Sequence, residues 1–139
     1  MAEYKGKLLK GLFTKAKTVL FDNGANVEES IDGTGYTIDF NTALVTGTYQ
    51  QVVRVSNKLI VNVVCVAAAN SSSNQAIFSI KKGTAAISCL TGFVIGYRLT
   101  NDGNHAYCPL TASGVVSAGP SYPLVATKIY NFSFIIELS

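Results

Sequence analysis

Residues 93–110, with the sequence FVIGYRLTNDGNHAYCPL, carry the pattern that decides the fold class. A period of two, typical of a β-strand, runs through the first half. Its two series are Phe93, Ile95, Tyr97 and Leu99, and Val94, Gly96, Arg98 and Thr100. Asn101, Asp102 and Gly103 are turn residues, and the series Ala106, Cys108 and Leu110 continues beyond them. The stretch therefore predicts two strands joined by a turn.

Similar patterns recur through residues 36–139. The face from Tyr130 to Leu138 is apolar without a break, so we expect a central strand there. Residues 59–68 are apolar on both faces, which predicts a strand covered on both sides. Residues 111–125 contain two Gly and two Pro and predict a long surface loop.

The strands are expected near residues 36–40, 48–56, 59–68, 75–81, 85–90, 93–100, 105–110 and 126–138. No segment with a helical period separates them, which favours antiparallel pairing over βαβ units. The predicted fold class is all-β, an antiparallel β-sandwich that is jelly-roll-like and has about eight strands.

The N-terminal segment follows a different pattern. Residues 1–35 hold ten of the nineteen charged side chains, so we expect an anchoring arm over 1–35 and a β-sandwich head domain over 36–139. Apolar residues of the arm recur with a helical period, although a short strand over 18–21 is an alternative. Its expected docking residues are Leu8, Leu9, Leu12, Phe13 and Leu20.

Charge is scarce overall. Charged residues are 14% of the chain, against about 25% in average proteins. The net charge of +3 is a weak electrostatic footprint, so we expect no nucleic-acid partner. The longest apolar stretch, residues 59–69, is far shorter than the ~20 residues that cross a bilayer, so we expect no membrane insertion.

Polarity comes instead from 37 Ser, Thr, Asn and Gln residues. With 48% hydrophobic residues, such a chain has more apolar side chains than one core needs. We expect part of the sandwich to be covered by another subunit. The candidate contacts are Ile60, Val64, Ile129 and Ile135, on the second faces of the 59–68 and 129–138 strands.

Residues that could support catalysis are few. Cys65, Cys89 and Cys108 have no C-x-x-C spacing and are expected in the core. His105 is the single histidine and stands next to a turn, without a nucleophile motif or a second pair of metal ligands. We therefore expect no enzyme activity, no catalytic residues, no cofactor and no metal.

Polar and aromatic residues gather in the predicted loops. Asn101, Asp102, Asn104, Tyr107 and Tyr122 are candidate ligand-binding residues, because aromatic rings beside polar tips suit glycans. A carbohydrate-binding, lectin-like module is therefore the alternative function.

The opening KLLKGLFTKA at residues 7–16, with Asn23-Gly24 and residues 27–31, resembles the N-terminal anchor of small bacteriophage virion proteins. The strand at Gly47-Thr48-Tyr49, the Ser-, Thr- and Asn-rich loops and the closing YNFSFII at 130–136 are similar to the heads of phage fibres. The resemblance implies a tumour-necrosis-factor-like or related jelly roll that assembles as a homotrimer. The lack of a shaft, repeat or coiled coil argues against a full tail fibre.

The expected function is that of a non-enzymatic phage virion structural protein. It would be displayed on the particle as a head fibre or capsid decoration, or as a small host-adhesion tip. Its expected partners are its own copies, capsid or tail proteins, and a host-surface glycan. The absence of a visible secretory signal fits synthesis in the cytoplasm of the host bacterium, followed by assembly into the virion.

Overall fold

The hairpin expected at residues 93–110 is present. In the computed structural model, which describes residues 35–100 and 103–139, β6 (Gly92–Arg98) pairs antiparallel with β7 (His105–Leu110). The other strands of these ranges are β1 (Tyr36–Phe40), β2 (Val45–Val55), β3 (Lys58–Ala67), β4 (Ala76–Lys82), β5 (Ala85–Ala86), β8 (Val115–Ser117) and β9 (Ile129–Glu137). The described residues contain no helix.

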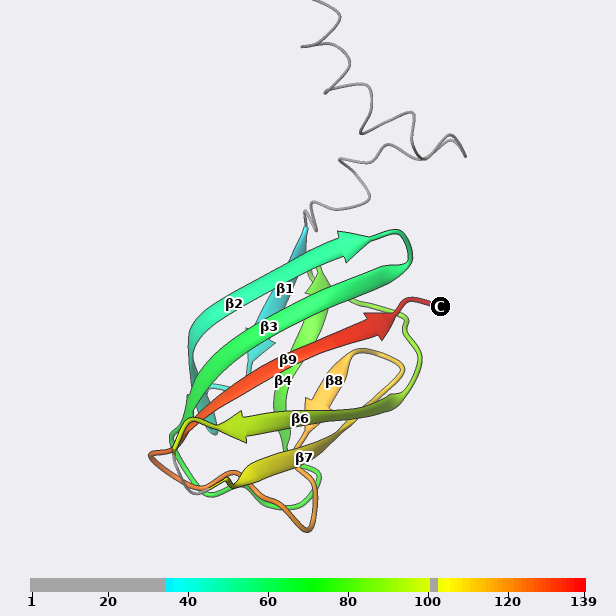
Figure 1. The fold of residues 1–139 in the computed structure, drawn as a ribbon. Coiled ribbons are helices and arrows are strands. Elements are labelled where there is room, and N and C mark those ends of the chain that lie inside the picture. The colour runs from blue at the N-terminus through cyan, green and yellow to red at the C-terminus, as the bar shows by residue number, and fades with distance from the viewer. Residues whose placement is uncertain (1–34, 101–102) are drawn as a thin grey trace, which may run out of the picture.

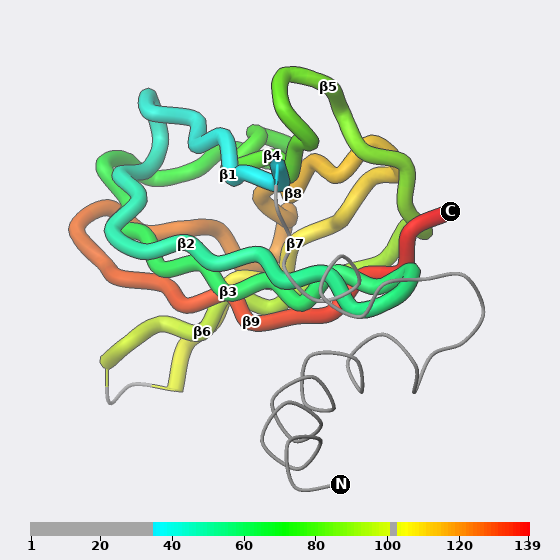
Figure 2. The backbone as a smooth tube through the Cα atoms, turned by 90° about the horizontal axis from the view of Figure 1, so that it is seen from above, coloured from blue at the N-terminus to red at the C-terminus, as the bar shows by residue number. Residues whose placement is uncertain are grey.

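All strand pairs are antiparallel and form one sheet in the order β1-β4-β8-β7-β6-β9-β3-β2, with β5 paired to β4. The sheet curls until its two end strands meet, where the Ile38 N–H donates to Gln50 Oε1 at 3.0 Å. Strands β2, β3, β9 and β6 form one layer, and β1, β4, β8 and β7 form the other (Figures 1 and 2). This barrel-like sandwich confirms the predicted all-β, jelly-roll-like fold class.

Aromatic rings fill the space between the layers. Tyr130 and Phe132 of β9 are fully buried, as the apolar face of that strand predicts. The ring of Phe78, on β4 in the opposite layer, meets Phe132 edge to face at 5.3 Å between centroids. The three cysteines are buried, which confirms their expected place in the core.

The inner face of the β6–β7 hairpin is lined by small residues because of Phe132. Gly96 lies opposite both Phe132 of β9 and Ala106 of β7. A Cβ atom added at Gly96 would stand 2.4 Å from the Phe132 ring, so only glycine fits here. Consequently the series Val94, Gly96, Ala106 and Cys108 is buried, whereas Phe93, Tyr97 and Leu99 are exposed.

Three predictions for individual segments differ from the structure. Within the single chain, the 59–68 strand, β3, is covered on one face only, since Ile60 on its other face is 42% exposed. Residues 111–125 are not simply a surface loop, because they contain β8 and the buried side chains of Val116, Ala118 and Leu124. The 85–90 strand also shortens to β5.

Gly96→Ala should test how tightly the hairpin packs on Phe132. The added methyl group must displace a fully buried ring, and overpacking of this kind costs about 1–3 kcal/mol. Gly92→Ala is the matched control, because nothing lies within 4 Å of the point that a Cβ atom would occupy there. Urea denaturation should show a lower free energy of unfolding for Gly96→Ala alone. Equal stability of the two variants would contradict this packing.

Candidate binding surface

Five rings lie together on the outside of the hairpin and on the segment that follows β8. They come from β6, β7 and the loop before β9 and are called here the aromatic surface: Phe93, Tyr97, His105, Tyr107 and Tyr122. The pairing register places Tyr97 opposite His105, Ile95 opposite Tyr107 and Phe93 opposite Pro109. These residues face outward because the alternate positions face the core.

The rings are stacked in pairs. Phe93 and Tyr107 have centroids 4.9 Å apart and an interplanar angle of 11°. His105 and Tyr122 have centroids 4.8 Å apart and an angle of 25°. Phe93 is nevertheless 63% exposed and Tyr122 is 50% exposed. Stacking of this kind is worth about 0.5–1.5 kcal/mol per pair, so it holds the rings in place while leaving much of their surface open.

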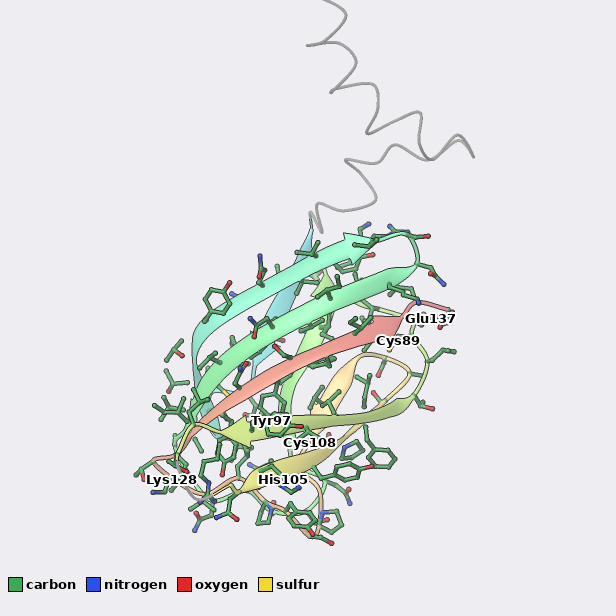
Figure 3. The ribbon with its side chains drawn as sticks, viewed as in Figure 1. Cys89, Tyr97, His105, Cys108, Lys128 and Glu137 are labelled. Atoms are coloured by element: carbon green, nitrogen blue, oxygen red, sulfur yellow. The ribbon has the colours of Figure 1, made fainter. Side chains whose placement is uncertain are left out.

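Buried contacts position the loop that carries Tyr122. The Leu124 side chain is fully buried, and its N–H donates to Ser71 Oγ at 2.7 Å. The Val125 N–H donates to Tyr130 Oη at 2.9 Å. Gly119 packs so closely on the backbone of Tyr107 that a side chain there would overlap the Tyr107 carbonyl oxygen. These contacts fix the loop against β7, and Figure 3 shows His105 and Tyr97 on the two hairpin strands.

A second exposed area lies on β3 and β9 and is called here the aliphatic face. It is formed by Ile60, Ile129 and Ile135, with half-buried Val53 and Val64 beside them. Val53, Ile60 and Ile135 are direct neighbours across three strands, and Ile135 is 64% exposed. The predicted excess of apolar residues on these second faces is therefore present.

Polar residues cross the aliphatic face at its middle. Asn62 of β3 lies opposite Ser133 of β9, whose hydroxyl donates to Asn62 Oδ1 at 3.0 Å. Charged residues stand at its ends: Lys58 is paired in register with Glu137 at one end, and Lys128 directly precedes Ile129 at the other. Within the described part of β3 and β9, the exposed centre of the face is thus uncharged.

The predicted ligand-binding residues are brought together in part. Tyr107 and Tyr122 both belong to the aromatic surface, although Tyr107 lies on β7 rather than in a loop. Asn104 is exposed and directly precedes β7. Asn101 and Asp102 lie outside the described residues, and so do the predicted docking residues Leu8, Leu9, Leu12, Phe13 and Leu20.

Sequence reasoning missed Phe93, Tyr97 and His105 as members of the surface. A signal was present in the small residues Gly96 and Ala106, which mark the crowded inner face of the hairpin. The large residues that alternate with them must then face outward.

Acidic and basic side chains elsewhere form one described ion pair, Lys81 Nζ to Asp39 Oδ2 at 2.8 Å. Asp39 also lines a shallow hollow of about 220 Å³ between β1, β4 and β8. Over residues 35–100 and 103–139, no group of three His, Cys, Asp or Glu side chains is placed to hold a metal ion. The same ranges contain no helix long and apolar enough to cross a membrane.

Cys65 and Cys108 are buried thiols beneath these surfaces. Burial in apolar surroundings raises the pKa of each to about 12, from an ordinary value of 9.0. For Cys108, a backbone hydrogen bond from Gly119 opposes the rise, and nearby Cys65 adds to it. Both thiols stay protonated and unreactive at neutral pH.

No protein-family model, curated protein sequence or solved structure matches this chain. The exposed side chains therefore carry the functional inference.

The buried thiols predict a loss of stability at alkaline pH. Between about pH 9 and 12 a thiol ionises in the unfolded chain but not in the folded one, so the free energy of unfolding falls as pH rises. From pH 7.5 to 10.5 the loss is about 2 kcal/mol for each thiol. The Cys65→Ala/Cys108→Ala variant should lose correspondingly less than the wild type in urea denaturation at the two pH values. An equal loss would contradict the assigned burial.

Proposed function

We propose that this chain is a non-enzymatic structural protein of a bacteriophage virion. It is displayed on the particle surface as a head fibre or capsid decoration, or as a small host-adhesion tip. The head domain assembles as a homotrimer, and the N-terminal residues Leu8, Leu9, Leu12, Phe13 and Leu20 dock on other capsid or tail proteins. The N-terminal resemblance to phage virion anchors supports the attachment, and the aliphatic face supports the assembly.

The observation that carries the proposal is the exposed aliphatic face. Ile60 and Ile135 are adjacent on neighbouring strands of a regular sheet, yet are 42% and 64% exposed. Removing apolar surface from water contributes roughly 25 cal/mol per Å², so covering this face favours association. Contiguous exposed apolar area is typical of an interaction site rather than of free surface.

Charge makes a second copy of the chain the best occupant. The middle of the face holds aliphatic and amide or hydroxyl groups, and charged residues stand at its ends, Lys58 and Glu137 at one and Lys128 at the other. An uncharged centre with a polar rim is the usual anatomy of a subunit interface. Identical copies can therefore approach without like-charge repulsion, and Lys58 of one copy can meet Glu137 of another.

Trimerisation also supplies a mechanism for surface display. Three heads joined to one particle present three equivalent outer surfaces. Linked sites raise overall avidity without any new contact, because the second and third binding events become intramolecular.

Ile135→Arg tests the assembly. The side chain is exposed in the single chain, so the head should still fold, but three buried arginines would repel one another. Light scattering of the full chain at micromolar concentration should give three times 14.7 kDa, about 44 kDa, for the wild type and 14.7 kDa for the variant. Thr84→Arg, on the exposed β4–β5 turn, is the control and should stay trimeric. A monomeric wild type, or a trimeric Ile135→Arg, would refute the assembly.

The neighbouring genes test the virion assignment separately. We expect capsid or tail genes on both sides of the gene for this chain. Genes of sugar metabolism there, together with a chain that binds glycans as a monomer or dimer, would favour the carbohydrate-binding alternative instead.

A further inference from the structure

The aromatic surface is a feature that assembly through the aliphatic face does not use. It lies on β6, β7 and the loop before β9, whereas the aliphatic face lies on β3 and β9. Its rings contribute little to the core, because Phe93, Tyr97 and Tyr122 are each at least half exposed. We infer that this surface is a binding site for an uncharged glycan, with Phe93, Tyr107 and Tyr122 as its stacking platforms.

The paired geometry leaves ring faces open to a ligand. Tyr122 is stacked on His105 and remains 50% exposed. In the same way Phe93 is stacked on Tyr107 at 4.9 Å and remains 63% exposed. Aromatic faces are electron-rich, so they attract the C–H groups that line one face of a pyranose ring.

The platforms are held before a ligand arrives. Phe93 and Tyr107 stand on paired strands, and the loop of Tyr122 is fixed by the buried side chain of Leu124. Each ring is also held by its stacking partner. The rings therefore lose little conformational freedom when a ligand binds. Such a loss is one of the main free-energy costs that oppose binding.

The charged residues around the aromatic surface indicate which class of glycan suits it. Neither β7 nor residues 118–127 contain a Lys, Arg, Asp or Glu. Arg98 at the end of β6 lies over the buried Tyr130 ring instead, at 5.9 Å from its centroid. Lys128 directly precedes β9 and lies at the same end of the sheet as His105, opposite Glu137 (Figure 3). Because β7 and residues 118–127 supply no cation, a sialylated, sulfated or phosphorylated ligand seated on them would lose its water without a charged partner there, whereas a neutral sugar has no charge to desolvate.

Polar groups around the rings suit a ligand rich in hydroxyls. Tyr97, Tyr107 and Tyr122 each carry a phenolic hydroxyl, and exposed Asn104 directly precedes β7. Phenols and amides both donate and accept hydrogen bonds, as sugar hydroxyls do. The inference extends the adhesive form of the proposed function, since a glycan held here would make the chain an adhesion protein.

A glycan array printed with neutral and acidic glycans tests the inference, followed by calorimetry of the full chain with the neutral glycan that binds best. We expect neutral glycans to bind. Tyr107→Ala and Tyr122→Ala should each weaken the affinity about ten-fold, as expected for the loss of one stacking contact. Tyr107→Phe, which keeps the ring, should retain most of it. Tyr49→Ala removes an exposed tyrosine from β2 and should change nothing.

Three outcomes would overturn the inference: binding of acidic glycans only, binding of no glycan, or neutral binding that both alanine variants leave intact. A fall in molecular mass on Tyr107→Ala or Tyr122→Ala would also overturn it, because the surface would then be a contact between copies. A wild-type chain that is monomeric but binds neutral glycans through Tyr107 and Tyr122 would refute the trimer and leave this inference standing.

Discussion

The packing of Phe132 against Gly96 is the constraint on which the rest of the structure depends. Phe132 and Phe78 fill the space between the two layers, so the hairpin has room only for small inner residues where it faces Phe132, at Gly96 and Ala106. The side chains that alternate with these two residues, including Tyr97, His105 and Tyr107, then face outward. The same crowding that closes the core therefore creates the aromatic surface.

This constraint also explains how much was predictable from sequence. The alternation at 93–99, the apolar series at 130–138 and the buried cysteines predict strands and core directly, because each pattern is local. The local sequence does not show which of the two alternating series at 93–99 faces the core, because Val94 and Ile95 are both apolar. The packing against Phe132, which is distant in sequence, decides between them. The strand β8 is three residues long and flanked by turn residues, which is why residues 111–125 resemble a loop. Tyr107 belongs to the aromatic surface because of its register on β7, not because it lies in a loop.

We propose a different role for each of the two exposed areas of the head. The aliphatic face has a nearly uncharged surface that suits identical copies, and the aromatic surface has ring faces and hydroxyls that suit sugars. They meet where β6 pairs with β9, so ligand sites in a trimer would lie beside the subunit contacts. The docking residues of the arm and the boundary at residue 35 stay predictions.

Hydroxyl-radical footprinting of the assembled full chain, normalised to the unfolded chain residue by residue, tests this division most directly. We expect fast oxidation of Phe93, Tyr107 and Tyr122, and protection of Ile60 and Ile135 to nearly the level of buried Tyr130. Protection of the three rings together with fast oxidation of the two isoleucines would contradict it.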